Sequence, residues 1–134
     1  MHKELKIGSA ISNLRIVEKV IDDISTELGM KEEVYGKILV SAMEAVNNAI
    51  VHGNKADTKR YVKIEFVFKK KELIISVEDE GQGFRPQEIP DPTKPENIEN
   101  ITGRGVFLMS KLADSIEFNE KGNRVTMSFK DIQT

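Results

Sequence analysis

Hydrophobic residues recur every three or four positions in two N-terminal segments, which is the period of an α-helix. Before them, residues 3–9 alternate well enough for a short strand. Ser12 or Asn13 is a suitable cap for the first helix, and Gly29 a suitable end. A second, longer helix is predicted over residues 31–52. The apolar stripe of the first helix comprises Leu14, Val17, Val20, Ile21, Ile24 and Leu28.

Farther along the chain the period of the apolar residues changes from about 3.6 to two. Residues 62–68 and 73–77 alternate in this way and are predicted to be strands. A short buried helix is expected over 106–112, and two closing strands over 115–118 and 124–129. The resulting order β-α-α-β-β-loop-α-β-β predicts an α/β (α+β) two-layer sandwich, with helices on one face of a mainly antiparallel sheet.

The long connection before the last helix is unusual. All four prolines of the chain fall between Pro86 and Pro95, which excludes a regular helix or a central strand there. The irregular stretch over 85–102 exceeds the roughly 12–15 residues of ordinary loops, and such segments are lids, binding loops or disordered. We expect it to act as a lid over a binding site.

Composition narrows the class of protein. A length of 134 residues with 39% hydrophobic content fits a single domain, residues 1–134, with one core. The net charge of −2 argues against direct nucleic-acid binding. The absence of cysteine excludes disulfides and thiolate metal sites, and no apolar run reaches the roughly 20 residues that span a bilayer. A cytoplasmic protein without membrane contact is the expectation.

The second helix carries a polar stripe. Lys37, Ser41, Glu44 and Asn48 lie three or four residues apart and therefore share one face. For an isolated amphipathic helix the simplest interpretation is a stripe facing solvent. Alternatively, the Asn48 amide oxygen suits Mg²⁺, and Glu44 one turn earlier is placed to orient or deprotonate a nucleophile. Asn47 points roughly 100° away from Asn48 and is a weaker candidate for the ion.

An acid follows the apolar face of the second hairpin strand. Asp79 continues the alternation of residues 73–77, where a carboxylate is costly unless it has a partner. One such partner is an adenine amino group; the other interpretation is that the side chain merely caps the following turn. Gly81 and Gly83 allow a flat base to approach closely, and Phe84 is placed to form a wall of the pocket.

A third segment, Gly103, Arg104 and Gly105, stands directly before the predicted 106–112 helix. Backbone N–H groups at a helix start are free to hold phosphate. Arg104 either adds a bidentate phosphate contact or faces solvent. Two glycines in this position are also common as simple turn chemistry, but the adjacent lid favours a phosphate site.

Together, residues 44–53, 77–84 and 103–109 resemble the N, G1 and G2 boxes of the GHKL ATPases. With residues 91–97 in the lid, the chain is most similar to the bacterial anti-sigma serine kinases of partner-switching systems. The resemblance implies a Bergerat-type, histidine-kinase-like ATPase fold that binds ATP and Mg²⁺. It also implies phosphorylation of a STAS-type anti-anti-sigma protein and sequestration of a sigma factor. Oligomeric state is left open, with a homodimer among the options.

By position, the resemblance implies that Glu44 is the catalytic base, Asn48 the magnesium ligand and Asp79 the adenine contact. It places the glycines in nucleotide-binding loops: Gly81, Gly83, Gly103 and Gly105. Two other interpretations stay open. One is a nucleotide-binding regulatory module with weak or no kinase activity and a partner other than a sigma factor. The other is an unrelated α+β domain with coincidental glycine turns.

Overall fold

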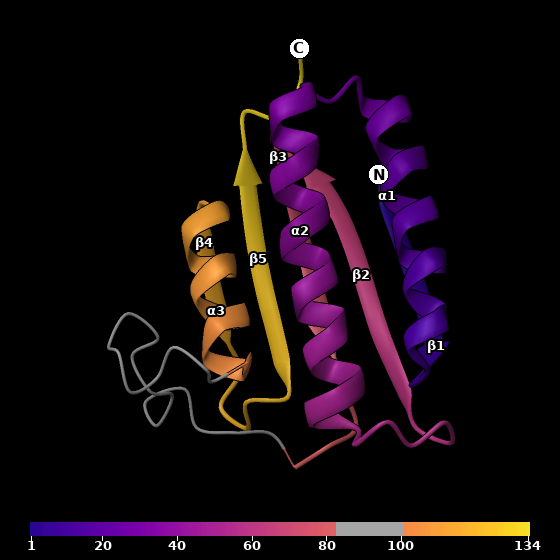
Figure 1. The fold of residues 1–134 in the computed structure, drawn as a ribbon. Helices are drawn as coiled ribbons and strands as arrows, with labels where there is room; N and C mark the ends of the chain where they lie inside the picture. The colour runs from indigo at the N-terminus through magenta and orange to yellow at the C-terminus, as the bar shows by residue number, and fades with distance from the viewer. Residues whose placement is uncertain (83–100) are drawn as a thin grey trace.

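The computed structural model describes residues 1–82 and 101–134, the first four of the second range by their backbone alone (Figure 1). Strands and helices follow one another in the predicted order. Their bounds are β1 (His2–Gly8), α1 (Leu14–Leu28), α2 (Glu32–Asn48), β2 (Tyr61–Lys69), β3 (Glu72–Glu78), α3 (Ile101–Leu112), β4 (Ser115–Phe118) and β5 (Arg124–Lys130).

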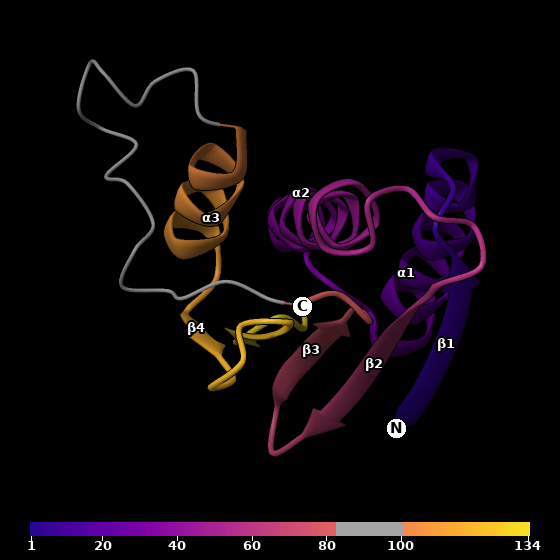
Figure 2. The ribbon, with the colours of Figure 1, turned by 90° about the horizontal axis from the view of Figure 1, so that it is seen from below.

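The elements form two layers, as predicted. Figure 2 shows α1, α2 and α3 side by side over one face of the sheet. The five strands pair antiparallel in the order β1-β2-β3-β5-β4, so β3 and β5 lie inside the sheet. Because β3 pairs with β5, its two ends lie beside chain segments that are distant in sequence. The site described below lies at the end where β3 stops and the β4–β5 turn begins.

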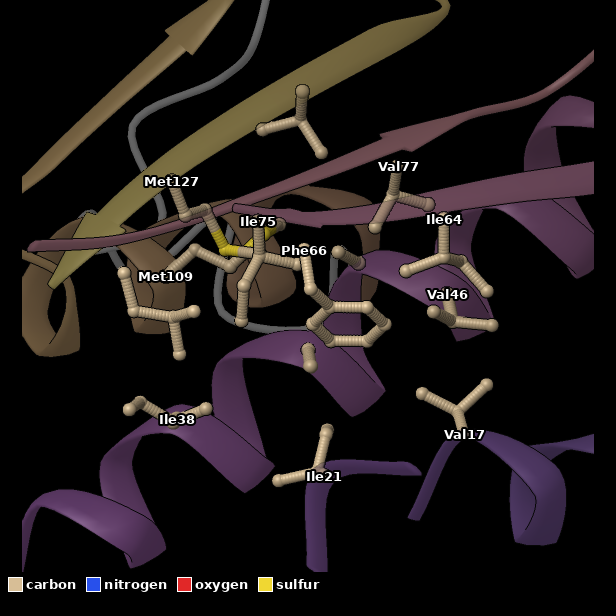
Figure 3. Close-up of a cluster of buried hydrophobic side chains, with 14 of the residues drawn as sticks. Val17, Ile21, Ile38, Val46, Ile64, Phe66, Ile75, Val77, Met109 and Met127 are labelled. Carbon is tan, nitrogen blue, oxygen red and sulfur yellow. The ribbon is translucent and has the colours of Figure 1, made fainter. Parts of the chain in front are cut away.

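The core lies between the sheet and the helices. Alternate residues of the strands point to the helical layer, which explains the period of two in the sequence. Fully burying each such large side chain stabilises the fold by about 1.5–3 kcal/mol. In Figure 3 the side chains of the sheet point toward those of α1 and α2. The sheet contributes Ile64, Phe66 and Ile75, and the two helices contribute Val17, Ile21 and Val46; all six are buried.

The first helix begins differently from the prediction. A short 3₁₀ turn, η1 (Ile11–Asn13), precedes α1, and no side chain caps the helix. Asn13 instead donates a hydrogen bond from Nδ2 to the Gly8 carbonyl, 2.8 Å away, so its amide ties η1 to β1. The predicted end is confirmed, because Gly29 adopts the left-handed conformation with φ 64°.

The second helix ends in a wider turn. After α2 the chain continues as η2 (Ala49–Gly53), a π-helical turn, and the Asn54 N–H donates to the Ala49 carbonyl at 2.8 Å. The predicted end at His52 is therefore correct to within one residue. Single π-helical turns occur frequently at functional sites because they change the direction of the side chains that follow.

The third helix starts earlier than predicted. It begins at Ile101, so Gly103 and Gly105 lie inside its first two turns rather than before it. The later start was predicted because the two glycines were interpreted as a loop before the helix; in the structure both are helical, and Gly105 lies against α2. The last two residues of the predicted lid, Ile101 and Thr102, are thus helical. The rest of the predicted lid, 85–100, lies outside the described residues.

Candidate functional site

A cavity of about 260 Å³ opens between α2, α3 and the ends of β3 and β5. This is near the lower limit of the roughly 300–1,000 Å³ of ligand pockets. Asn48 lines one part of it and Asp79 another, and the walls between them are largely apolar, including Ala49, Val77 and Met109. A mainly apolar cavity with a few polar groups at separate positions suits a nucleotide, whose flat base is attached to a polar sugar and phosphates.

The C-terminal part of the polar stripe of α2 faces α3, whereas Lys37 at its other end is exposed to solvent. Ser41 is fully buried, and Gly105 of α3 lies directly against the stripe. A Cβ built on Gly105 would come within 2.8 Å of Asn48 Nδ2 and 3.1 Å of Glu44 Oε2. The structure therefore brings together the predicted base, the predicted metal ligand and one predicted phosphate-loop glycine.

Asn48 has the donor atom that a magnesium site requires. Its Oδ1 atom is buried and accepts no hydrogen bond from any residue in the described ranges, 1–82 and 101–134; the same holds for Ser41 Oγ. Buried polar atoms without a partner are rare, and leaving them so costs free energy. Mg²⁺ prefers oxygen ligands and combines one or two protein oxygens with water and phosphate. The residues present therefore fit the ion.

Glu44 lies one turn before Asn48 on the same face of α2, beside Gly105. Its carboxylate is partly exposed and does not line the cavity wall. A general base needs contact with the reacting hydroxyl rather than with the bound base, so a position at the margin suits that role.

Asp79 follows the last residue of β3 and lines the cavity. Its Oδ1 accepts the Gly81 N–H at 2.8 Å, so the side chain does cap the turn. Desolvation raises the pKa of this carboxyl above its ordinary value, and the Gly81 N–H opposes the rise. The turn cap, one of the two alternatives, is thus present, and the same side chain lines the cavity; the adenine contact, the other alternative, stays a prediction.

Two glycines make this arrangement of Asp79 sterically feasible. A Cβ on Gly53 would lie 2.2 Å from Asp79 Oδ2, and a Cβ on Gly81 would lie 2.1 Å from the Gly53 carbonyl oxygen. Both distances are far shorter than any contact a side chain tolerates. The end of η2 and the turn after β3 therefore pack backbone against backbone, which brings the first two motifs together.

The structure gives little or nothing on four of the predicted site residues. Gly83 and Phe84 lie outside the described residues. The backbones of Gly103 and Arg104 belong to the first turn of α3, where N–H groups have no acceptor within the helix. The predicted phosphate contacts of Gly103 and Arg104 stay predictions.

The sequence-based interpretation missed four polar side chains that line the cavity: His52, Lys55, Asn123 and Arg124. His52 continues the spacing of four that links Glu44 to Asn48, so the stripe itself carried a signal for it. Lys55 adopts a left-handed backbone with φ 54°, which costs a residue other than glycine about 1–3 kcal/mol. The bond that brings Asn123 to the site had no local signal, because its partner in that bond, Asp79, is 44 residues away.

In the part of the chain that the structure describes, no helix combines the length and the apolar character needed to cross a bilayer.

Comparison with known proteins identifies a family and named relatives. Residues 8–129 match the histidine kinase-like ATPase domain family. The chain is similar to the serine-protein kinase RsbW of Bacillus subtilis, with 24% identity over 132 residues, 93% of this chain and 82% of that protein. It is also 36% identical over 100 residues to an anti-sigma F factor of Clostridium perfringens, covering 69% of this chain and 70% of that protein.

The fold has a solved counterpart. The crystal structure of the RsbU and RsbW domains of a Mycobacterium tuberculosis protein superimposes with a TM-score of 0.71 at 16% identity, which shows a shared fold. That alignment covers 97% of this chain and 32% of the other, so this chain spans about a third of the length of the larger protein. The family match over most of the chain and the common fold together place this chain in the histidine kinase-like ATPase domain family.

Proposed function

We propose that this chain is an ATP-dependent serine/threonine protein kinase and an anti-sigma factor. It phosphorylates a STAS-type anti-anti-sigma protein and sequesters a sigma factor when that antagonist is phosphorylated. The kinase and anti-sigma names of the two relatives support both parts of the proposal. The observation that carries it is the buried, unpaired Oδ1 of Asn48 beside Glu44, in a cavity that Asp79 lines.

In this proposal the adenine occupies the apolar part of the cavity and donates its amino N–H to Asp79. Asn48 holds Mg²⁺, which when bound neutralises charge on the phosphate oxygens. Glu44 accepts the proton of the substrate hydroxyl while the hydroxyl oxygen bonds to the γ-phosphorus and the bond to the bridging oxygen of ADP breaks. In the same proposal, backbone N–H groups at the start of α3 bind the phosphates, because the first turn of a helix has free N–H donors.

Replacing Glu44 by glutamine separates binding from chemistry. The amide keeps the size of the side chain but accepts no proton, so phosphoryl transfer should fall about 10²–10⁴-fold while the Kd for ATP changes little. Labelled ATP, Mg²⁺ and a purified STAS-domain protein give the transfer rate, and calorimetry gives the Kd. Glu33→Gln, an exposed carboxylate in the first turn of α2, is the matched control.

Unchanged transfer by Glu44→Gln would remove Glu44 as the base. A wild-type chain that binds Mg-ATP but phosphorylates no STAS protein would instead be a nucleotide-binding regulatory module. Failure of the wild type to bind any adenine nucleotide would reject the cavity as a nucleotide site.

A further inference from the structure

Asn123 is hydrogen-bonded to both backbone polar groups of Asp79, its N–H and its carbonyl. The Asp79 N–H donates to the Asn123 carbonyl at 2.9 Å, and Asn123 Nδ2 donates to the Asp79 carbonyl at 2.8 Å. These two bonds extend the β3–β5 ladder by one rung beyond the last regular pair, Glu78 with Arg124. The residue proposed to contact adenine thus has its main chain fixed from the neighbouring strand.

The bond to the Asp79 carbonyl has an unusual donor, a side-chain amide. In a hydrogen-bonded antiparallel pair, each of the two residues donates its backbone N–H to the carbonyl of the other. Here the Asn123 N–H is turned away and donates to Asn119 Oδ1 at 3.0 Å. The side-chain amide of Asn123 takes the place of its backbone N–H and satisfies the Asp79 carbonyl.

Asn119 in turn orients Asn123. Its Oδ1 also accepts the N–H groups of Gly122 at 2.8 Å and Arg124 at 3.1 Å, which closes the β4–β5 turn. Its Nδ2 donates to Asn123 Oδ1 at 2.8 Å, so the Asn123 amide has one favourable orientation, with Nδ2 toward Asp79. Two asparagines on one turn therefore form a relay, Asn119 to Asn123 to Asp79.

The turn after Asp79 is held from the opposite side. The Glu80 N–H donates to Oδ1 of the fully buried Asn54 at 2.8 Å, and the Gly81 N–H donates to the Asp79 carboxylate. Three successive backbone N–H groups, those of residues 79, 80 and 81, thus have fixed acceptors. A carboxylate on a backbone held this firmly loses little conformational freedom when it binds a ligand.

We propose that Asn123, oriented by Asn119, is a positioning residue for base recognition: it fixes the main chain of Asp79 so that the carboxylate is preorganised to accept the adenine amino group. The inference rests on the proposed adenine contact of Asp79 and adds the group that controls it. Guanine carries an oxygen where adenine carries the amino group, so the positioning residue should affect selectivity between ATP and GTP.

The test compares Kd values for Mg-ATP and Mg-GTP in Asn123→Ala and the wild type. Loss of one hydrogen bond of ordinary strength should raise the Kd for ATP about three- to tenfold and leave that for GTP unchanged. The kcat at saturating ATP should stay within about twofold, because uniform binding affects KM. Asn13→Ala is the matched control: it also removes an Nδ2-to-carbonyl bond of 2.8 Å, but at a residue that does not line the cavity.

A double-mutant cycle with Asp79→Asn identifies the route of the effect. If Asn123 acts through Asp79, adding Asn123→Ala to Asp79→Asn should cause no further loss of ATP affinity. A full additional loss in the double variant would show that Asn123 contacts the nucleotide directly and would overturn the positioning role. Equal weakening of ATP and GTP would show a merely structural turn and would also overturn it.

Two further outcomes separate this inference from the proposed function. If Asp79→Asn binds ATP as tightly as the wild type, the adenine contact itself is wrong, and the positioning role falls with it. If Asp79→Asn is weakened but Asn123→Ala is not, the positioning role alone is wrong. Should Asn123→Ala fail to fold, Asn123→Asp keeps the acceptor for Asn119 but lacks the donor, and should weaken ATP binding at least as much.

Discussion

Gly53 and Asp79 lie so close that a single methyl group at Gly53 would occupy the space of the Asp79 carboxylate. The Cβ would be 2.2 Å from Oδ2 and 2.3 Å from Cγ. Gly53 ends the π-helical turn after α2, and Asp79 follows β3, so this contact joins the helical layer to the sheet at the cavity.

Gly53→Ala should abolish tight ATP binding. The added methyl group must displace the Asp79 carboxylate and break its bond to the Gly81 N–H, at a cost of about 1–3 kcal/mol in stability. Calorimetric titration with Mg-ATP measures the first effect and urea unfolding the second. Gly36→Ala is the matched control, because a Cβ there meets nothing within 4 Å; in the exposed middle of α2 it should stabilise by roughly 0.5–1 kcal/mol. ATP binding that survives Gly53→Ala would contradict the role of this contact.

Asp79→Asn should stabilise the nucleotide-free protein at neutral pH. Desolvation raises the pKa of Asp79 in the folded state above its ordinary 3.8. The folded protein therefore binds this proton more tightly than the unfolded chain, and the free energy of unfolding falls as pH rises from about 4 through the folded pKa. Tm should thus be higher in Asp79→Asn at pH 7, and the difference should shrink toward pH 4.

Thermal unfolding between pH 4 and pH 7.5 without nucleotide measures this difference. Glu120→Gln, an exposed carboxylate in the β4–β5 turn, serves as the control. A Tm of Asp79→Asn below that of the wild type at pH 7 would show that the charged carboxylate stabilises the fold, contrary to the burial argument.

Asn48→Ala should remove the effect of Mg²⁺ on ATP affinity. The substitution deletes the buried, unpaired Oδ1 without touching the adenine end of the cavity, so adenosine should bind as in the wild type. Titrations with ATP in Mg²⁺ and in EDTA, and with adenosine, measure the three affinities. Asn47→Ala changes the neighbouring amide on another face of α2 and should retain the Mg²⁺ effect. A Mg²⁺ effect of normal size in Asn48→Ala would place the ion elsewhere.

Asn54→Ala should be among the most destabilising substitutions in the chain. Its fully buried amide donates to Ser9 Oγ at 2.9 Å and to the Tyr61 carbonyl at 3.0 Å, and accepts the Glu80 N–H at 2.8 Å. Each buried group left without a partner costs roughly 1–3 kcal/mol. Urea unfolding measures the loss, and a change below about 1 kcal/mol would show that water replaces the amide.

Local pattern predicted the elements and their order. The change of period from 3.6 to two marks the passage from helices to strands near residue 61, and Gly29 ends α1 as expected. Glu44 and Asn48 were identified as partners because a spacing of four defines neighbours on any helix. Such features depend on residues close together in the chain, and local geometry alone decides them.

Tertiary structure decided what these residues face. The sequence left open whether the polar stripe of α2 meets solvent; the packing of Gly105 against Asn48 shows that the C-terminal part of the stripe meets α3, while Lys37 is exposed. The sequence also left open whether Asp79 caps a turn or contacts a ligand; in the fold its carboxylate caps the turn and lines the cavity, and the adenine contact stays a prediction. The bonds by which Asn123 and Asn54 hold the turn around Asp79 gave no signal in the sequence, since they span 44 and 26 residues. Periodicity describes one element at a time, whereas a cavity arises where several elements meet, so only folding could show which side chains share it.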